Sequence, residues 1–247
     1  MNALLLAAGV GSRLRPYTDA RPKPMLEIGG RPILHHNLAM LAAAGFRDVV
    51  VNLHHLPGVV RASVGDGSAF GVRVRYGDEP ALLGTAGALL PFADAFAHGT
   101  FAIVFGDNLN DVDLRNVVRA HRASDAVATV VLYARDDVSQ SGVAELGTDD
   151  RIVRFVEKPR AGETTSHWVN AGIVVAEPAL LEVVPRETPS DLGRDVLPAL
   201  AARGALRGYR MSGGHWWFDR VEDYERAQTD PALAAFVARE GRRSPFA

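Results

Sequence analysis

The sequence predicts an α/β fold with a doubly wound, mostly parallel, Rossmann-like sheet and a β-rich antiparallel extension. In the first half of the chain, apolar β-rich runs alternate with stretches of helical periodicity, the pattern of a parallel sheet with crossover helices. Between about 126 and 175 the β-rich runs are too close together for crossover helices, so antiparallel pairing is expected there. Doubly wound sheets bind ligands beyond the carboxyl ends of their strands, so a site is expected at that edge.

The elements of the first half follow from the apolar pattern. The run at 4–8 is expected to be a buried strand that stops at Gly9. Apolar residues spaced by four and three, followed by Gly45, predict a helix over 32–44. The remaining elements alternate, with strands expected at 49–53, 72–76 and 101–105 and helices at 58–64 and 84–90.

The second half is expected to be β-rich and then helical. The tail from 229 onward is rich in alanine and arginine, which indicates a terminal helix followed by a frayed end. Ser190 is the expected cap of the helix that follows it. The predicted strands are 127–133, 152–156 and 171–175, and the predicted helices are 114–122, 178–183, 191–202 and 221–227.

The composition excludes several classes of function. The 247 residues include 27 Lys and Arg against 29 Asp and Glu, scattered along the chain, so no nucleic acid polymer is expected as a partner. The absence of cysteine excludes disulfides, thiol catalysis and thiolate metal sites, so any metal must be held by oxygen or imidazole. No segment approaches the apolar length of a membrane span and the N-terminus leads directly into a strand; we expect no membrane partner and a cytoplasmic location.

A candidate anion-binding loop follows the first strand. Gly9 and Gly11 allow backbone N–H groups to approach phosphate oxygens, and Arg13 and Lys23 supply fixed positive charge. A dinucleotide fingerprint needs a third glycine where this chain has Leu14, and the prolines that follow disfavour an immediate helix. A dinucleotide fold is therefore the weaker interpretation. An ordinary glycine turn with exposed arginines is the structural alternative.

Two aspartates are candidates for a metal site. Asp107 follows the strand at 101–105, at the edge where ligands bind, and Asp219 ends an aromatic run. Proteins hold Mg²⁺ with one or two carboxylates together with substrate phosphates, so this pair suits a magnesium polyphosphate. The structural alternatives are an Asx turn for Asp107 and a helix cap for Asp219. Asp111 and Asp113 are weaker metal candidates.

A third group of polar residues flanks two predicted strands of the β-rich region. Glu157 and Lys158 follow the strand at 152–156, and Asn170 precedes the strand at 171–175. A carboxylate and an amide suit sugar hydroxyls, and an ammonium suits a phosphate. The spacing alone favours a solvated surface ion pair between Glu157 and Lys158.

The paired histidines and tryptophans are expected to be structural. The pairs His35-His36 and His54-His55 lack the convergent partners that a zinc site needs. Trp216-Trp217 is expected to anchor packing, with an aromatic wall against a sugar or base as the alternative.

Five blocks of sequence carry a family resemblance. They are 7–16 with Pro22-Lys23-Pro24, Leu83-Gly84-Thr85-Ala86-Gly87, Gly106-Asp107-Asn108, Phe155-Val156-Glu157-Lys158-Pro159 with Asn170-Ala171-Gly172, and Trp217-Phe218-Asp219. In this order they closely resemble the motifs of the sugar-1-phosphate nucleotidylyltransferases, the NDP-sugar pyrophosphorylases. The resemblance covers about 1–228, and five ordered blocks are far more specific than any one of them.

The resemblance implies transfer of a nucleoside monophosphate from a nucleoside triphosphate to a sugar 1-phosphate, with release of pyrophosphate and with Mg²⁺ as cofactor. The partners are then these two substrates, and a homo-oligomer is possible. The roles that the resemblance implies are catalysis by Arg13, Lys23 and Asp107; nucleotide binding by Ala7, Ala8, Gly9, Gly11, Ser12, Arg13, Gly84 and Thr85; sugar-phosphate binding by Asn108, Gly142, Glu157, Lys158 and Asn170; and metal binding by Asp107 and Asp219.

The resemblance also implies a domain division and a substrate class. A single nucleotidyltransferase domain is expected over 1–228, with 1–125 mainly nucleotide-binding and 126–228 mainly sugar-phosphate-binding, before a tail at 229–247. The block from Leu83 looks most like guanylyltransferases, which predicts GTP with mannose or heptose 1-phosphate. The block from Gly106 looks more like thymidylyltransferases, so dTTP or UTP with glucose 1-phosphate is the alternative.

One departure from the family pattern leaves a second class of function open. Arg220 follows Asp219, and the isoleucine and glycine usual after this aspartate are absent. A catalytically impaired regulator that binds nucleotide sugars is therefore the alternative. A nicotinamide-dependent oxidoreductase comes third, opposed by Leu14.

Overall fold

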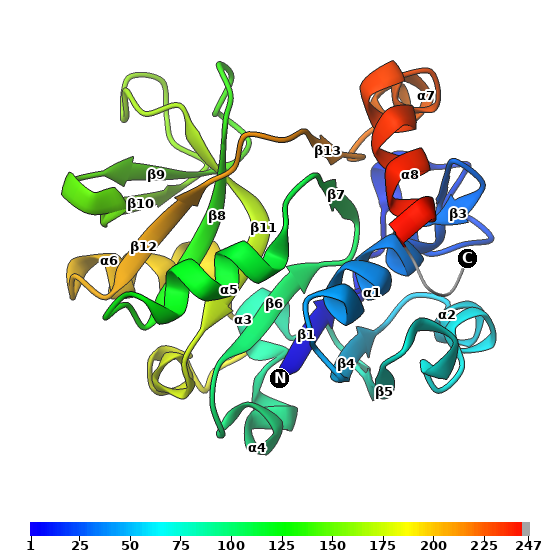
Figure 1. Cartoon of the computed structure of the whole chain (residues 1–247), viewed down its shortest axis with the longest axis horizontal. Helices are drawn as coiled ribbons and strands as arrows, with labels where there is room; N and C mark the ends of the chain where they lie inside the picture. The colour runs from blue at the N-terminus through cyan, green and yellow to red at the C-terminus, as the bar shows by residue number, and fades with distance from the viewer. Residues whose placement is uncertain (244–247) are drawn as a thin grey trace. The chain divides into compact units, whose positions relative to one another are not determined.

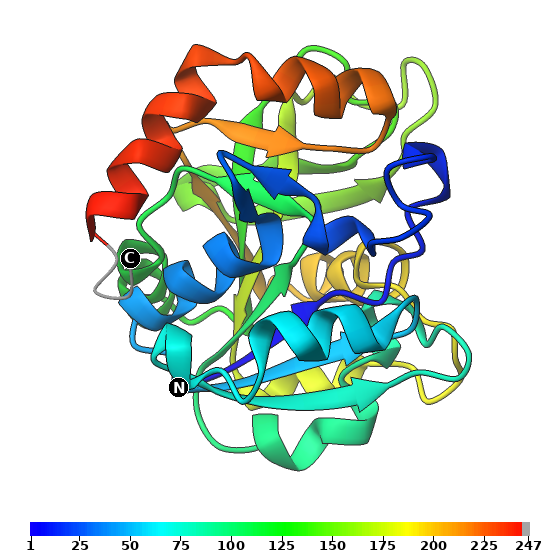
Figure 2. The same cartoon turned by 90° about the vertical axis from the view of Figure 1, so that its right-hand side faces the viewer.

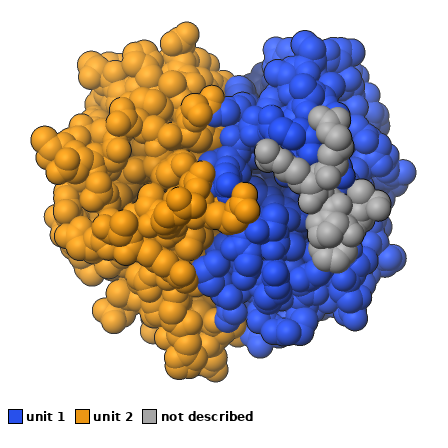
Figure 3. Space-filling view, in the orientation of Figure 1, with its two compact units in different colours: residues 1–82, 104–113, 213–247 blue, residues 83–103, 114–212 orange. Residues whose placement is uncertain are grey.

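The computed structural model describes residues 1–243. The chain divides into two compact units, shown in two colours in Figure 3. Unit 1 comprises Met1–Leu82, Val104–Asp113 and Gly213–Ala247, and unit 2 comprises Leu83–Ile103 and Leu114–Ser212. No helix among the described residues combines the length and the apolar character that a membrane crossing requires.

Unit 1 contains a parallel sheet that matches the prediction for the first half of the chain. Strand β1 (Asn2–Leu6) pairs with β4 (Asp48–Leu53), which pairs with β5 (Arg73–Asp78), all parallel. The connecting helices are α1 (Ile33–Ala43) and α2 (Pro57–Val64), and Figure 2 shows both beside this sheet. The strand predicted at 4–8 is shifted, because the chain leaves the sheet after Leu6 and enters the loop.

The end of strand β6 lies beside the end of strand β1 in unit 1. Strand β6 (Phe101–Phe105) is shared between the units, and Val104 begins its part in unit 1. Beyond the strand, the Gly106 N–H donates to the Leu6 carbonyl at 2.8 Å. A Cβ at Gly106 would lie 2.8 Å from the same carbonyl oxygen, so this close approach requires glycine. The predicted proximity of the Gly106 turn and the end of the first strand is confirmed.

The rest of unit 1 contains short strands that the apolar pattern did not predict, and the two C-terminal helices that it did. Strand β7 (Asn108–Asn110) pairs antiparallel with β13 (His215–Trp217), and β2 (Glu27–Ile28) pairs with β3 (Arg31–Pro32). Helices α7 (Val221–Gln228) and α8 (Pro231–Arg243) follow, as labelled in Figure 1. The helices expected at 221–227 and in the tail are present, and residues 244–247 of the predicted tail lie outside the described residues.

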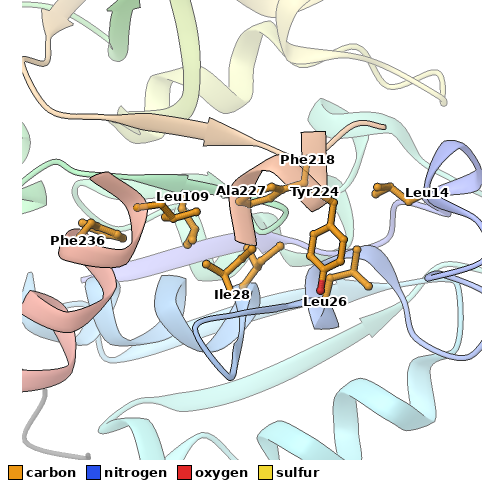
Figure 4. Packing of buried hydrophobic residues seen from close by; sticks show 10 residues of the cluster. Leu14, Leu26, Ile28, Leu109, Phe218, Tyr224, Ala227 and Phe236 are labelled. Carbon is orange, nitrogen blue, oxygen red and sulfur yellow. The ribbon is translucent and has the colours of Figure 1, made fainter. Parts of the chain in front are cut away.

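A cluster of buried side chains holds these segments together (Figure 4). It unites residues from the turn after the glycine loop, the β2–β3 hairpin, β7 and both C-terminal helices. Trp216 packs against it, which confirms the packing role expected for that tryptophan. Its members are Leu14, Leu26, Ile28, Ile33, Leu109, Phe218, Tyr224, Ala227, Leu233 and Phe236.

Unit 2 contains the predicted antiparallel region. Strand β8 (Ala128–Ala134) pairs antiparallel with β11 (Trp168–Ala176), β9 (Gly142–Leu146) pairs antiparallel with β10 (Ile152–Glu157), and Val169 of β11 faces Val143 of β9. Strand β12 (Leu206–Arg210) adds a parallel partner to β8. Strands β9 and β12 are additions to the prediction. The sequence of β12 contains a glycine and two arginines, a composition that strand propensity does not favour.

The helix predicted at 114–122 is present, whereas the other predicted helices of unit 2 are shorter or are wholly or partly 3-10 or π in type. The helical segments of unit 2 are α3 (Gly84–Gly87), α4 (Ala93–Phe96), α5 (Leu114–Arg122), the 3-10 turns Leu90–Phe92 and Pro178–Val183, the π-turn Leu192–Val196 and α6 (Leu197–Ala202). The expectation that Ser190 caps the helix at 191–202 is wrong. Asp191 occupies the cap, and its side chain accepts from the N–H groups of Gly193 and Arg194. Its carboxylate reaches both donors, whereas the Ser190 hydroxyl is buried without a hydrogen-bond partner among the described residues.

Candidate active site

The predicted anion-binding loop in unit 1 is fixed by hydrogen bonds at its start and at Gly11, and its tip is exposed. The buried Ala7 N–H donates to Asn52 Oδ1 at 2.7 Å. Gly11 has φ +66°, a conformation that favours glycine, and the Thr18 hydroxyl donates to its carbonyl at 2.8 Å. The 3-10 turn Ser12–Leu14 then buries Leu14 and leaves Ser12 and Arg13 exposed. The loop can therefore present backbone and guanidinium donors to an anion.

Two buried polar residues beneath this loop were missed by the sequence analysis. Asn52, near the end of β4, donates from Nδ2 to Glu79 Oε1 at 2.8 Å, and both residues are buried. Ala7 is bonded to the same Asn52 amide, so the pair orders the exit of β1. The available signal was an asparagine inside the otherwise apolar run of β4, since such a residue needs a buried partner.

The candidate charge centre is Lys23, in the 3-10 turn Lys23–Met25. Its ammonium lies 2.7 Å from Asp107 Oδ2 and 2.7 Å from Asp219 Oδ1. Arg13 reaches the other oxygen of Asp219 at 3.4 Å. The Lys23 side chain is 8% exposed, against 31% for Asp107 and 42% for Asp219. A buried cation thus joins two carboxylates that remain accessible from outside.

The electrostatics of this centre keep Lys23 protonated. Burial lowers the pKa of its ammonium, but the charges of Asp107 and Asp219 and their hydrogen bonds outweigh burial and raise the pKa above its ordinary value. The side chain is therefore a permanent cation at neutral pH. Gly11 packs against its stem, because a Cβ at Gly11 would lie 3.0 Å from Lys23 Cβ. The glycine loop and the ammonium belong to one local structure.

Asp107 and Asp219 fit a magnesium site in their donor chemistry. Their carboxylates converge on one point, which the Lys23 ammonium occupies, and hard divalent cations prefer such oxygen donors. Within the described residues, no group of three or more His, Asp or Glu side chains could hold a metal ion. Proteins commonly hold Mg²⁺ with one or two carboxylates together with substrate phosphates and water. Asp219 does not cap α7, because Arg220 stands at that cap and makes no capping bond through its side chain.

The neighbours of these aspartates have other contacts. Asn108 begins β7, and its carbonyl accepts from Asn37 Nδ2 at 3.0 Å. Asp111, a weaker metal candidate, forms an ion pair with Arg239 at 2.5 Å. Trp216 donates from Nε1 to Asp230 at 2.9 Å, and His215 stacks on Trp217 with ring centroids 5.8 Å apart. Of these residues, Asn108 directly adjoins the candidate charge centre.

Glu157, at the end of β10, lies beside Gly142, which is another of the predicted sugar-phosphate residues of unit 2. Two glycines pack against its carboxylate, since a Cβ at Gly142 or Gly193 would lie 2.7 Å or 2.4 Å from Oε2. Burial, and then the charge of Asp191, raise the pKa of Glu157, while Lys158 and Arg194 lower it. This half-buried carboxylate differs from the exposed carboxylate of a solvated ion pair.

The other predicted residues of unit 2 lie on the flanking segments. Lys158 is exposed and has φ +52°. Asn170 lies in β11, where its Oδ1 accepts from the Gly172 N–H at 2.9 Å. Gly84 and Thr85 begin α3, and the Thr85 hydroxyl donates to Asp191 Oδ2 at 2.7 Å. Asp191 was missed by the sequence analysis, because its neighbours come from distant parts of the chain.

Comparisons with known proteins cover most of the chain. The sequence profile described as "Nucleotidyl transferase" matches residues 2–230. The chain is 35% identical over 242 residues to a UTP–glucose-1-phosphate uridylyltransferase of Synechocystis sp., covering 92% of this chain and 62% of the relative. It is 34% identical over 232 residues to a mannose-1-phosphate guanylyltransferase of Mycobacterium tuberculosis, covering 93% and 64%. The chain thus spans less than two thirds of the length of these relatives.

A solved structure supports the fold along nearly the whole chain. A Bacillus anthracis protein assigned as a glucose-1-phosphate thymidylyltransferase, solved in complex with sucrose, superposes with a TM-score of 0.82 at 27% identity. The match covers 92% of this chain and 94% of that one. The mixed α/β architecture predicted from the sequence is confirmed.

Proposed function

Because the chain belongs to the nucleotidyl transferase family, we propose that it transfers a nucleoside monophosphate from a nucleoside triphosphate to a sugar 1-phosphate. The observation that carries the proposal is the buried Lys23 ammonium, held 2.7 Å from both Asp107 and Asp219 beside a glycine loop. This arrangement concentrates donors and cations where a polyphosphate needs them, and two accessible carboxylates where a divalent cation needs them. The reaction is an in-line displacement at the α-phosphorus.

The proposed nucleotide-binding residues belong to unit 1 and the α3 turn. Backbone N–H groups of Ala8, Gly9, Gly11 and Ser12 donate to the triphosphate, and Arg13 adds a cation from the exposed tip. The Ala7 N–H, which donates to Asn52, orders the start of this loop. Lys23 neutralises charge at the α-phosphate. Gly84 and Thr85 lie along the nucleobase.

The proposed cofactor is Mg²⁺, held by Asp107 and Asp219. When bound, the ion neutralises phosphate charge, including the charge that develops on the pyrophosphate leaving group. The two aspartates orient it, and Lys23 keeps their carboxylates together when no ion is bound.

The proposed sugar-phosphate residues are Asn108 and the Glu157 group. Glu157 accepts hydrogen bonds from sugar hydroxyls, Asn170 and Gly142 contribute further polar contacts, and Lys158 binds the phosphate. A phosphate oxygen of the sugar attacks the α-phosphorus, and the bond from that phosphorus to the bridging oxygen of the β-phosphate breaks. The attacking oxygen is already ionised, so no general base is required, and catalysis rests on alignment and charge stabilisation.

The proposed substrates are GTP with mannose or heptose 1-phosphate. The guanylyltransferase of M. tuberculosis supports this choice, together with the sequence block from Leu83. The uridylyltransferase of Synechocystis sp. and the B. anthracis protein support the alternative, which is UTP or dTTP with glucose 1-phosphate. Base and sugar are selected by pocket shape and backbone groups more than by residue type, so similar sequences serve both classes.

One assay tests the proposal. Pyrophosphate release is measured for four nucleoside triphosphates against mannose, heptose and glucose 1-phosphates, with Mg²⁺, for the wild type and for Asp107→Asn. We expect release with a restricted set of pairs and a loss of at least about 100-fold in Asp107→Asn. Exposed Asp19→Asn is the matched control and should retain wild-type turnover. Nucleotide binding without pyrophosphate release from any pair would contradict the proposal and favour the regulator.

A further inference from the structure

Asp191 links two groups of proposed binding residues within unit 2. Its Oδ2 accepts from the Thr85 hydroxyl at 2.7 Å. Its Oδ1 accepts from the N–H groups of Gly193 at 2.9 Å and Arg194 at 3.1 Å. One half-buried carboxylate therefore bonds to α3 with one oxygen and to the π-turn Leu192–Val196 with the other.

On one side, these bonds fix the turn proposed to contact the nucleobase. The Thr85 hydroxyl, which donates its proton to Asp191, also accepts from the Leu192 N–H at 2.8 Å, so its one donor and one acceptor lone pair are used inside the protein. Gly84 has φ +82°, and a Cβ there would lie 2.2 Å from the Ser190 carbonyl oxygen. The Ser190 N–H in turn donates to the Leu83 carbonyl at 3.0 Å. Hydrogen bonds and close packing thus fix the α3 turn to the segment that begins at Ser190 and Asp191.

On the other side, the capped π-turn packs against the carboxylate proposed to bind the sugar. A Cβ at Gly193 would lie 2.4 Å from Glu157 Oε2, and the Gly193 N–H is one of the donors held by Asp191. Gly142 packs against the same oxygen, with its Cβ position 2.7 Å away. A shift of the π-turn would therefore move one wall of the space that holds the Glu157 carboxylate.

We propose that Asp191 is a positioning residue that fixes the α3 turn and the Glu157 carboxylate relative to each other, and so couples recognition of the nucleobase to recognition of the sugar. This inference rests on the proposed function for the identity of the two ligands. Asp191 itself touches neither ligand. Its effect is transmitted through Thr85 and through Gly193.

The central experiment compares Asp191→Asn with the wild type in the pyrophosphate-release assay. The asparagine keeps the size and one acceptor oxygen for the cap, but it loses the charge and the second acceptor that Thr85 uses. We expect the KM of the triphosphate and the KM of the sugar 1-phosphate each to rise about tenfold, with kcat changed less than about threefold. Asp195→Asn is the matched control on the same turn, because Asp195 is exposed and the asparagine keeps an acceptor oxygen for its bond with the Asp191 N–H.

Threonine variants provide a second route if Asp191→Asn folds poorly. Thr85→Val removes the hydroxyl and should raise both KM values, whereas Thr85→Ser keeps the hydroxyl and should restore them. The double variant Thr85→Val/Asp191→Asn should be no worse than the more impaired single variant, because both break the same link. A role confined to local stability would not produce this non-additivity in both KM values.

A pH profile supplies a readout specific to the sugar side. The charge of Asp191 contributes to the raised pKa of Glu157, so the acidic limb of the sugar KM profile should move to lower pH in Asp191→Asn. Circular dichroism and thermal melting confirm that each variant is folded. An active wild type with unchanged KM values in both Asp191→Asn and Thr85→Val overturns the positioning role alone. An inactive wild type overturns the proposed function and this inference with it.

Discussion

Lys23 and Lys158 are the two lysines of a chain that has 27 lysines and arginines in total, and both lie in the proposed binding groups. An ammonium is a compact charge with three donors, so it fits between two carboxylates, where the planar fork of an arginine would pair with one. The Lys23 ammonium lies 2.7 Å from a carboxylate oxygen of Asp107 and 2.7 Å from one of Asp219. Its removal leaves Asp107 and Asp219 facing each other with their shared cation gone.

Replacing Lys23 with methionine should lower stability and increase the response to magnesium. We expect Lys23→Met to lower the free energy of unfolding by about 1–3 kcal/mol without Mg²⁺, because two partly buried carboxylates lose the cation that they share. Mg²⁺ then takes the place of the ammonium, so it should raise the melting temperature of the variant more than that of the wild type. Thermal melts with and without Mg²⁺ measure both effects. Lys158→Met removes the same charge from an exposed site and should melt like the wild type, with or without Mg²⁺.

Replacing Glu157 with glutamine should stabilise the protein at neutral pH. The pKa of Glu157 is raised in the folded protein, so its ionised form is disfavoured there and ionisation costs stability above the folded pKa. This cost disappears as the pH falls below the pKa of the unfolded chain. Glu157→Gln should therefore melt about 1–3 °C higher than the wild type at pH 7 to 8, with the gain vanishing near pH 4. Glu145→Gln, which breaks an ion pair with Arg154, should show no gain, and a Glu157→Gln protein less stable at pH 8 than the wild type would contradict the assignment.

At the scale of elements, the α3 turn depends on one glycine for two separate reasons. Gly84 has φ +82°, and the position of a Cβ lies 2.2 Å from the Ser190 carbonyl oxygen. Gly99 in the same unit has φ +81°, but open space surrounds its Cβ position. Comparing substitutions at Gly84 and Gly99 therefore separates the free-energy cost of a positive φ from the cost of a steric clash.

Alanine at these two positions should have unequal effects. Gly99→Ala is expected to cost about 1 kcal/mol through its positive φ, whereas Gly84→Ala adds the clash and should cost about 3 kcal/mol or more. Chemical denaturation of both variants gives the difference directly. Equal losses would show that the turn moves away from Ser190 freely, contrary to the hydrogen bonds that pin it.

Elements were predictable where the local apolar pattern sets the structure. The runs of β1, β4 and β6 are buried on both faces, so their apolar character alone identified them. Strands β7 and β13 have three residues each and exist through pairing with each other, which no local pattern records. Asp191 replaced Ser190 as the cap for a related reason: Thr85, distant in sequence, binds its carboxylate. Asp107 and Asp219 were predicted as a pair from the sequence. That Lys23 lies between them could not be predicted, because this contact depends on the tertiary structure.

At the scale of the whole molecule, the sequence-based boundary at 228 separates two helices that share a core. Leu233 and Phe236 of α8 are buried with Phe218, next to Asp219, and with Leu14, next to Arg13. Trp216 donates to Asp230 at the beginning of α8, which ties the helix to β13. Helix α8 thus supports the chain segments that carry the charge centre, although it contributes no residue to that centre.

Truncating one core residue of α8 tests this support. Leu233 is 1% exposed, so Leu233→Ala should lower the free energy of unfolding by about 3 kcal/mol through lost burial and a cavity. Because Leu233 shares a buried cluster with Leu14 and Phe218, the neighbours of Arg13 and Asp219, the stabilisation that Mg²⁺ with nucleotide gives should also weaken by at least about threefold in apparent affinity. Leu82→Ala is the matched control in unit 1, since Leu82 is 44% exposed and its truncation should change neither quantity. Equal stability losses in the two variants would mean that α8 is not part of the core of unit 1. A stability loss in Leu233→Ala with wild-type ligand affinity would mean instead that the core holds the unit together without positioning the charge centre.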